Sequence, residues 1–309
     1  MTSTSTRERT DRYLARTATG EAVLGDDRGF VPLAAADPVL ETVGEALRVA
    51  PEGVSDPGAA SASLVESESL RFGTPFDPGR LLGIGLNYAD HAADLDESSP
   101  TEPATFLKPR SSLAGPSGPI RLPPTEISDR VTAEAELAVV IGRTCRDVPV
   151  EEVGNVVAGY LPVIDLTAED VLQRNPRFLT RAKGFDTFLV LGPQVAVLDG
   201  EAESGSDDGR TDDTASSDTL ADLADLSVRT IVNEEVVAEN TVSNMHASPT
   251  ELVSFCSRSA TLRPGDVIST GTPGAGVIEP GDTVRAEVDR VGTVSAPVVR
   301  DPDGSEGES

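Results

Sequence analysis

The sequence contains few of the residues on which several classes of protein depend. Two cysteines and two histidines occur among 309 residues, and tryptophan is missing, so neither a disulfide framework nor a zinc-ligand pattern is present. No run of about 18 apolar residues is long enough for a spanning helix. Residues 1–16 are rich in Ser, Thr and Arg and lack the apolar core of a secretory signal. We therefore expect a cytoplasmic protein with reduced thiols.

Positive charge is also scarce. The chain has 25 basic residues against 52 acidic ones, for a net charge of −27. A surface with this charge repels nucleic acids and anionic membranes, so we exclude both as partners and expect a small-molecule substrate. A large excess of acids also indicates a halophilic origin, because concentrated ions screen the repulsion between carboxylates.

Lysine is the rarest basic residue of all. It occurs only at Lys108 and Lys183, and the other 23 basic residues are arginine. A lysine that persists in such a chain indicates a place where a compact ammonium group cannot be exchanged for a guanidinium. The alternative is that both lysines are accidental surface residues.

The chain divides into segments of different composition. Residues 1–75 predict a small N-terminal β-rich domain with one helix at 38–49, and residues 76–300 predict the main domain. Residues 199–225 are rich in Asp, Glu, Ser and Gly and cannot bury enough apolar surface to order themselves, so we expect a disordered acidic loop there and an acidic tail at 301–309. Short strands separated by Gly and Pro turns, without a βαβ rhythm, predict an α+β fold.

Local patterns predict the main elements of the large domain. Strands are expected at 81–86, 105–109, 136–141, 161–165 and 226–232, and a short helix at 150–157. A hairpin is expected across residues 233–235. Ser248 and Glu251 form a capping box that predicts a helix to about Arg258, on which Cys256 is a small core residue rather than a nucleophile.

Three acidic residues are candidates for a metal site. Glu134 and Glu136 lie two positions apart in a predicted strand, so both carboxylates point to the same face. Asp165 follows a short apolar strand. Carboxylates at the edge of a core must be protonated, paired with a cation or bound to a metal, and three of them suit Mg²⁺ or Mn²⁺. The alternative is that these acids belong to a salt-adapted surface, in which case they should be exposed and far apart.

One histidine is a candidate general base. His91 follows the predicted strand at 81–86, and Asp94 lies three residues further on, where its carboxylate could orient the imidazole. An inert loop histidine is the alternative.

Six short motifs follow one another between residues 80 and 300. They are Gly85–His91, Phe106–Pro109, Glu134–Gly142, Ala182–Phe188, Gly192–Pro193 and Arg263–Pro273. In this order they resemble the fumarylacetoacetate hydrolase family, and six motifs in one order are more specific than any single motif. Both lysines of the chain fall inside them.

The resemblance implies a mixed β-roll with a small N-terminal domain, assembled as a homodimer. It also implies that Glu134, Glu136 and Asp165 hold a divalent metal that chelates the 2-oxo acid part of a substrate. Lys183 would then stabilise an enolate or oxyanion.

Further roles follow from the resemblance alone. His91 matches the family's general base, and Asp94 stands where some members carry a glutamate partner. Thr272 matches a position that hydrogen-bonds substrate or a metal-bound water. Tyr88 and Lys108 lie within shared motifs and are expected to bind substrate.

The chain also departs from the family pattern. Glu169 replaces an arginine that helps many members bind the substrate's carboxylate, and a glutamine that often follows is straddled by Leu172 and Gln173. The eighteen-residue step from Asp165 to Lys183 resembles the branch of isomerases, decarboxylases and dehydratases more than the eukaryotic fumarylacetoacetase.

We therefore expect a divalent-metal-dependent enzyme that acts on an open-chain 2-oxo acid through a metal-bound enolate. An activity like that of 2-hydroxyhepta-2,4-diene-1,7-dioate isomerase or a 2-oxo acid hydratase, in aromatic catabolism, is the first choice. The alternatives are a C–C hydrolase acting on acylpyruvate or fumarylacetoacetate, and a non-catalytic metal-binding homologue in which Glu169 has removed turnover.

Overall fold

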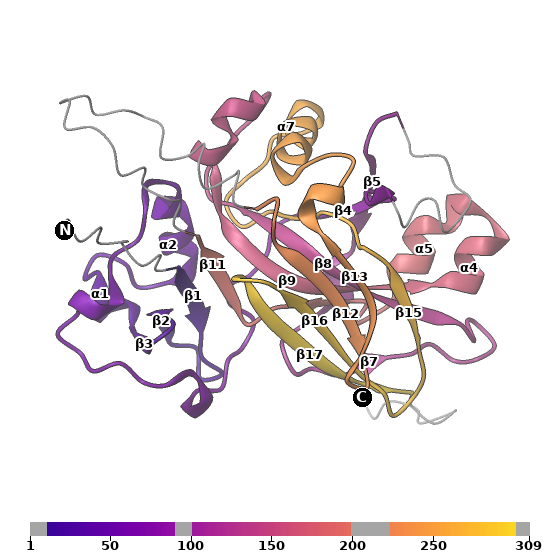
Figure 1. Ribbon diagram of the computed structural model, residues 1–309, viewed down its shortest axis with the longest axis horizontal. Helices are drawn as coiled ribbons and strands as arrows, with labels where there is room; N and C mark the ends of the chain where they lie inside the picture. The colour runs from indigo at the N-terminus through magenta and orange to yellow at the C-terminus, as the bar shows by residue number, and fades with distance from the viewer. Residues whose placement is uncertain (1–10, 90–100, 199–222, 301–309) are drawn as a thin grey trace, which may run out of the picture.

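The computed structural model describes residues 11–89, 101–198 and 223–300. Two sheets dominate it, with short helices at their edges (Figure 1). The twelve-stranded sheet contains β1 (Arg12–Arg16), β2 (Ala22–Asp26), β3 (Gly29–Pro32), β4 (Leu81–Gly85), β5 (Ala104–Lys108), β6 (Leu113–Ala114), β8 (Val131–Ile141), β9 (Val157–Ala168), β10 (Leu189–Leu191), β11 (Gln194–Val197), β14 (Val267–Ser269) and β15 (Ala275–Ile278). The five-stranded sheet contains β7 (Ile120–Arg121), β12 (Ser227–Val232), β13 (Glu235–Thr241), β16 (Thr283–Val288) and β17 (Gly292–Val299). The described helices are α1 (Leu33–Ala36), α2 (Val43–Val49), α4 (Glu169–Arg174), α5 (Leu179–Lys183) and α7 (Pro249–Ser259).

The long antiparallel pair β8 and β9 forms the centre of the molecule. Every residue of both strands is buried, which is typical of strands covered on both faces. On β8 the odd-numbered residues, such as Leu137 and Val139, contribute to the larger hydrophobic core, whereas Ala138 and Val140 belong to a second core. The second core also contains side chains of the N-terminal strands. Acids on the even-numbered face therefore lie beside this second core.

The N-terminal strands extend the large sheet. Strand β1 pairs antiparallel with β11, with Tyr13 opposite Ala196, and β2 and β3 follow outward. The Tyr13 hydroxyl donates to the Arg290 carbonyl at 3.0 Å, and the Arg290 guanidinium pairs with Asp11 at 2.6 Å. The predicted β-rich N-terminal part and the α+β class are confirmed, and this part shares its sheet with the main domain.

Two local predictions are confirmed in detail. Helix α7 begins with the Ser248 and Glu251 capping box, and Cys256 is buried on it with a free thiol. Strands β12 and β13 form the expected hairpin. Its turn residues Asn233 and Glu234 both have positive φ, as a tight two-residue hairpin turn requires.

Several predicted boundaries are wrong. Helix α2 begins at Val43 rather than at residue 38, because Thr42 and Glu45 form a capping box there. The expected helix at 150–157 is a 3₁₀ turn, Val150–Asn155. Strand β8 begins before its predicted range, and β9 begins before and ends after its own, because their pairing continues from Val131 opposite Ala168 to Ile141 opposite Val157.

Most of the predicted acidic loop lies outside the described residues. The described chain resumes at 223, and Leu223, which the prediction placed in the loop, is buried in the larger core. In the described part of the chain, no helix is long and apolar enough to cross a membrane.

Candidate active site

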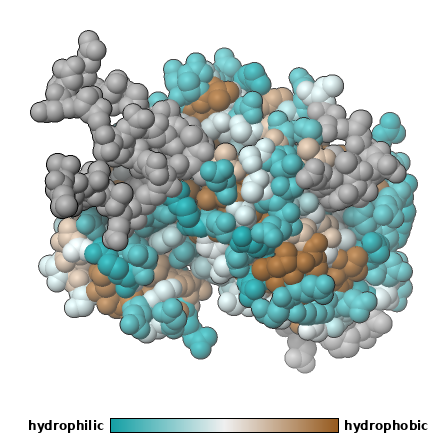
Figure 2. Space-filling view, in the orientation of Figure 1, coloured by the Kyte–Doolittle hydropathy of each residue, from teal (hydrophilic) through white to brown (hydrophobic). Residues whose placement is uncertain are grey.

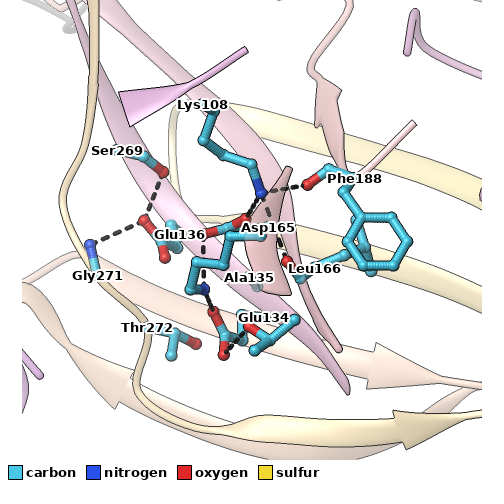
Figure 3. Close-up of polar contacts among 12 residues, drawn as sticks. Lys108, Glu134, Ala135, Glu136, Asp165, Leu166, Phe188, Ser269, Gly271 and Thr272 are labelled. Carbon is cyan, nitrogen blue, oxygen red and sulfur yellow. Dashed lines mark hydrogen bonds and ion pairs between the residues drawn. The ribbon is translucent and has the colours of Figure 1, made fainter. Parts of the chain in front are cut away.

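The pairing of β8 with β9 brings three acids together inside the molecule. Glu134 lies directly opposite Asp165 in the ladder, and Glu136 follows two residues later on the same face. The three residues are 9%, 2% and 0% exposed in the order Glu134, Glu136, Asp165. One carboxylate oxygen from each lies within 4.8 Å of the others, and the side chains converge in Figure 3. The alternative of a separated, exposed set of surface acids is therefore wrong.

The sequence predicted that the acids lie at strand ends, but in the structure they lie within their strands. Asp165 is followed by three more residues of β9, and Glu134 is preceded by three residues of β8. The sites of both acids are therefore fixed by a continuous ladder on each side.

Lys183 joins two of the acids. Lys183 is the last residue of helix α5. Its Nζ lies 2.7 Å from Glu134 Oε2 and 2.9 Å from Asp165 Oδ2. Its ammonium also lies 5.2 Å from the centre of the Phe106 ring, a distance at which cations are attracted to the ring face.

Lys108 approaches Asp165 from the other side. It is the last residue of β5, and its ammonium donates to Asp165 Oδ1, to the Phe188 carbonyl at 2.6 Å and to the Leu166 carbonyl at 3.4 Å. Both lysines of the chain therefore bind one aspartate, each to a different oxygen; Figure 3 shows the contact of Lys108 with Asp165. With its ammonium directed at protein oxygens, Lys108 is placed to hold Asp165.

The two ammonium groups set the charge state of the site. Burial alone would raise the pKa of Asp165, but Lys108 and Lys183 outweigh burial and hold that pKa below its usual range. Burial would lower the pKa of Lys183, yet Asp165, Glu134 and Glu136 raise it above the ordinary value. Lys183 is therefore a permanent cation, suited to stabilise negative charge rather than to accept a proton.

Glu136 has a different environment from the other two acids. Its Oε2 accepts from the Ser269 hydroxyl at the end of β14 and from the Gly271 amide at 2.8 Å. Burial, together with the charges of Asp165 and Glu134, raises the pKa of Glu136 to about 8. Lys183 only partly offsets this rise.

This raised pKa predicts an unusual pH dependence of stability for the metal-free protein. The ordinary pKa of glutamate, 4.5, applies to the unfolded chain, and the folded chain holds the Glu136 proton up to about 8. The folded state therefore binds more protons between these values, and the free energy of unfolding should fall as pH rises through this window. Urea unfolding in EDTA from pH 5 to 8.5 should show a steeper fall for the wild type than for Glu136→Gln. Equal slopes would contradict the assignment.

Three hydroxyl and amide donors at the site were not predicted. Thr167 donates to Glu134 Oε1 at 3.1 Å, and Ser269 and Gly271 hold Glu136. The position of Thr167 could have been found from strand alternation, because Thr167 lies two residues after Asp165 and therefore on the same face of the strand. Ser269 and Gly271 lie inside a recognised motif, but nothing in their spacing links them to Glu136.

The donor set fits a hard divalent cation. Its members are three carboxylates, with no histidine or cysteine among them, and oxygen donors are those that Mg²⁺ and Mn²⁺ prefer. Tyr88 lies beside them: its hydroxyl is buried and finds no hydrogen-bond partner in the described part of the chain. Burial and the charge of Glu136 raise its pKa, so Tyr88 keeps its proton and can donate to a bound ligand.

The remaining predicted residues are placed as follows. His91 and Asp94 lie outside the described residues. Thr272 is buried, and its hydroxyl donates to the Gly274 carbonyl at 2.8 Å in the turn after β14. Glu169 begins helix α4 directly after β9, and its carboxylate accepts from Gln173 at 3.2 Å.

The fold and the site together define an enzyme. Three acids and two ammonium groups in a protein core cost folding free energy, and such clusters of perturbed groups are typical of active sites. The model of the family described as "Fumarylacetoacetate (FAA) hydrolase C-terminal" matches residues 80–299. The chain belongs to the fumarylacetoacetate hydrolase family, whose members are isomerases and hydrolases.

Similar proteins carry different activities in their names. The chain is 35% identical over 232 residues to the mitochondrial oxaloacetate tautomerase fahd2 of Xenopus laevis, covering 72% of this chain and 66% of that protein. It is 28% identical to the crystal structure of 2-hydroxyhepta-2,4-diene-1,7-dioate isomerase from Mycobacterium marinum, with a TM-score of 0.66 and coverage of 96% and 100%. A fumarylacetoacetate hydrolase from Exiguobacterium antarcticum is 25% identical, with a TM-score of 0.72 and coverage of 94% and 99%.

Proposed function

We propose that this protein is a Mg²⁺- or Mn²⁺-dependent enzyme that enolises an open-chain 2-oxo acid, in the manner of a 2-hydroxyhepta-2,4-diene-1,7-dioate isomerase or tautomerase. The observation that carries the proposal is the buried set of Glu134, Glu136 and Asp165 with two lysine ammonium groups attached. A divalent ion held by the three acids would supply Lewis-acid stabilisation of negative charge on the 2-oxo acid.

The chain's own residues account for the rest of the chemistry. Lys183 stays charged and stabilises the oxygen on which an enolate's charge develops. Tyr88 and Thr272 offer hydroxyl groups that bind and orient the substrate. His91, oriented by Asp94, removes or returns the proton on carbon.

Lys108 has a supporting part in this scheme. Because its ammonium donates to Asp165 and to two carbonyls, it fixes the Asp165 carboxylate rather than the substrate. Glu169 stands where many family members carry an arginine that binds the substrate's carboxylate, so we propose that this reversed charge changes which substrate the enzyme holds.

We further propose a cytoplasmic homodimer. The two free, buried cysteines agree with a reducing compartment. The edge strand β13 and the neighbouring β15 expose Val236, Val237 and Val277, and Figure 2 shows an apolar area over these strands. An exposed apolar edge on a chain this acidic is suited to pair with a second copy.

Product analysis distinguishes the candidate reactions. The purified protein in concentrated KCl, with Mg²⁺ or with EDTA, is assayed against oxaloacetate, 2-hydroxyhepta-2,4-diene-1,7-dioate and an acylpyruvate by ultraviolet absorbance and NMR. We expect tautomer or isomer formation that falls at least about 100-fold in EDTA. Cleavage of acylpyruvate into two acids would instead establish the hydrolase, and Mn²⁺ binding without any turnover would establish a non-catalytic homologue.

A further inference from the structure

Asn87 connects three segments around the site. It follows β4 and is buried, and its side-chain amide donates to the Ala247 carbonyl at 2.9 Å and to the Thr270 carbonyl at 2.8 Å. Its side-chain oxygen accepts from the Ala247 amide at 3.0 Å, and its main-chain carbonyl accepts from the His246 amide at 2.6 Å. Both side-chain donors of Asn87 are therefore used on backbone carbonyls.

One of these bonds falls on the peptide unit that also holds a metal-site acid. The carbonyl of the Thr270–Gly271 peptide accepts from Asn87, and the N–H of the same peptide donates to Glu136 Oε2 at 2.8 Å. A planar trans peptide points its carbonyl and its N–H in opposite directions. Asn87 and Glu136 therefore bind opposite sides of one rigid unit.

Glycine at position 271 does not fix this orientation by itself. Gly271 has φ +96, and glycine adopts positive and negative φ about equally well. A flip of the peptide would turn the Thr270 carbonyl toward Glu136 and leave two oxygens facing each other. The donor on Asn87 opposes this flip, since it stabilises only the orientation in which the N–H faces Glu136.

We propose that Asn87 is a positioning residue that locks the Thr270–Gly271 peptide and, through its N–H, holds the Glu136 carboxylate for metal binding. Asn87 lies immediately before Tyr88, so the same hydrogen bond also fixes the backbone next to Tyr88 relative to the Thr270–Gly271 peptide. The metal part of this inference rests on the proposed function, whereas the peptide orientation can be measured without any metal.

The test uses an NMR probe of a single peptide group. Thr–Gly pairs occur only at Thr19–Gly20 and Thr270–Gly271 in this chain, so labelling threonine carbonyls with ¹³C and glycine nitrogens with ¹⁵N selects two amide signals. The Gly20 amide, which donates to the Thr17 carbonyl in a distant turn, serves as an internal reference. Mn²⁺ affinity is measured on the same samples by electron paramagnetic resonance.

In Asn87→Ala we expect the Gly271 amide proton to shift upfield while Gly20 stays in place, and Mn²⁺ to bind about 10- to 100-fold more weakly. The isosteric Asn87→Asp serves as the second variant if the alanine variant does not fold. It keeps the acceptor for the Ala247 amide but places a carboxylate against the Thr270 carbonyl, so we expect the same two changes.

Ser257→Ala is the matched control, because it keeps the Thr270–Gly271 pair that carries the label. It removes a buried hydroxyl that donates to the Ser254 carbonyl at 2.8 Å within helix α7, so it should lower Tm without moving the Gly271 signal or Mn²⁺ affinity. Unchanged Gly271 shift in both Asn87 variants, or equal changes in Ser257→Ala, would overturn the proposal. A wild type that binds no Mn²⁺ but shows the Gly271 shift in the variants would overturn the metal site and leave the peptide lock standing.

Discussion

Replacing Asp165 by asparagine is expected to abolish turnover and to destabilise the fold. The two ammonium groups that Asp165 neutralises would face an uncharged amide in a fully buried place. Breaking a buried ion pair by removing one partner costs about 3–5 kcal/mol, and here two pairs share the partner. Mn²⁺ should bind more than about 100-fold more weakly, because changes even to residues behind the ligands cost about 10- to 100-fold. Urea unfolding and Mn²⁺ titration measure the two effects.

Asp170→Asn is the matched control for this substitution. Asp170 lies five residues further along and carries its own ion pair to Arg174 at 2.8 Å, outside the acid cluster. It is partly exposed, so its loss should cost at most about 1 kcal/mol and leave turnover unchanged. An Asp165→Asn protein that retains wild-type Mn²⁺ affinity would contradict the assignment of Asp165 as a metal ligand.

Replacing Lys183 by methionine is expected to lower kcat about 10²–10³-fold while leaving Mn²⁺ affinity undiminished. The loss follows from removing a fixed cation beside the charge that develops on the substrate oxygen. Metal binding should not suffer, because the ammonium shares oxygens of Glu134 and Asp165 with the metal site and its removal reduces competition for them. Initial rates and an electron paramagnetic resonance titration on one preparation separate the two effects.

Two variants define what the Lys183 result means. Arg181→Met removes a cation from the same helix at an exposed position, so it should keep wild-type kcat. Lys183→Arg keeps the charge but cannot place one compact ammonium between two carboxylates, and an intermediate kcat is expected. A loss of metal affinity in Lys183→Met that matches the loss of kcat would show that the lysine only supports the fold of the site.

The sequence was sufficient to predict the members of the acid cluster. Glu134 and Glu136 share a face because strand side chains alternate, and the scarcity of lysine singled out Lys108 and Lys183. Each of these is a local or compositional property. Asp165 was added to them because it ends a short apolar strand in the sequence, and the structure places it opposite Glu134.

The contacts within the cluster could not be predicted in the same way. Lys108 on β5 and Lys183 on α5 come from different elements, and only the tertiary fold brings both ammonium groups to Asp165 of β9. Ser269 and Gly271 reach Glu136 across more than a hundred residues of sequence, at separations of 133 and 135. Such long-range pairs depend on tertiary packing, which no local pattern of these residues records.

Strand boundaries failed for a related reason. The predicted strand starts at Glu136 because acids interrupt the apolar pattern, yet β8 begins at Val131 and every residue in it is buried. Glu134 and Asp165 are buried beside a lysine ammonium group, and Glu136 accepts hydrogen bonds from Ser269 and Gly271. Such compensation by distant residues cannot be recognised in a short window of sequence. The active site is therefore the region in which the apolar pattern of the sequence predicts the strand boundaries least well.

Proton NMR in D₂O tests the central claim most directly. The wild type and the Glu134→Gln, Glu136→Gln double variant are each incubated with a 2-oxo acid in concentrated KCl, with Mg²⁺ or with EDTA. We predict that the wild type with Mg²⁺ catalyses deuterium uptake at the carbon beside the keto group, and that EDTA or the double substitution abolishes it. Uptake that proceeds equally in EDTA or in the double variant would contradict enolisation at the three-carboxylate site.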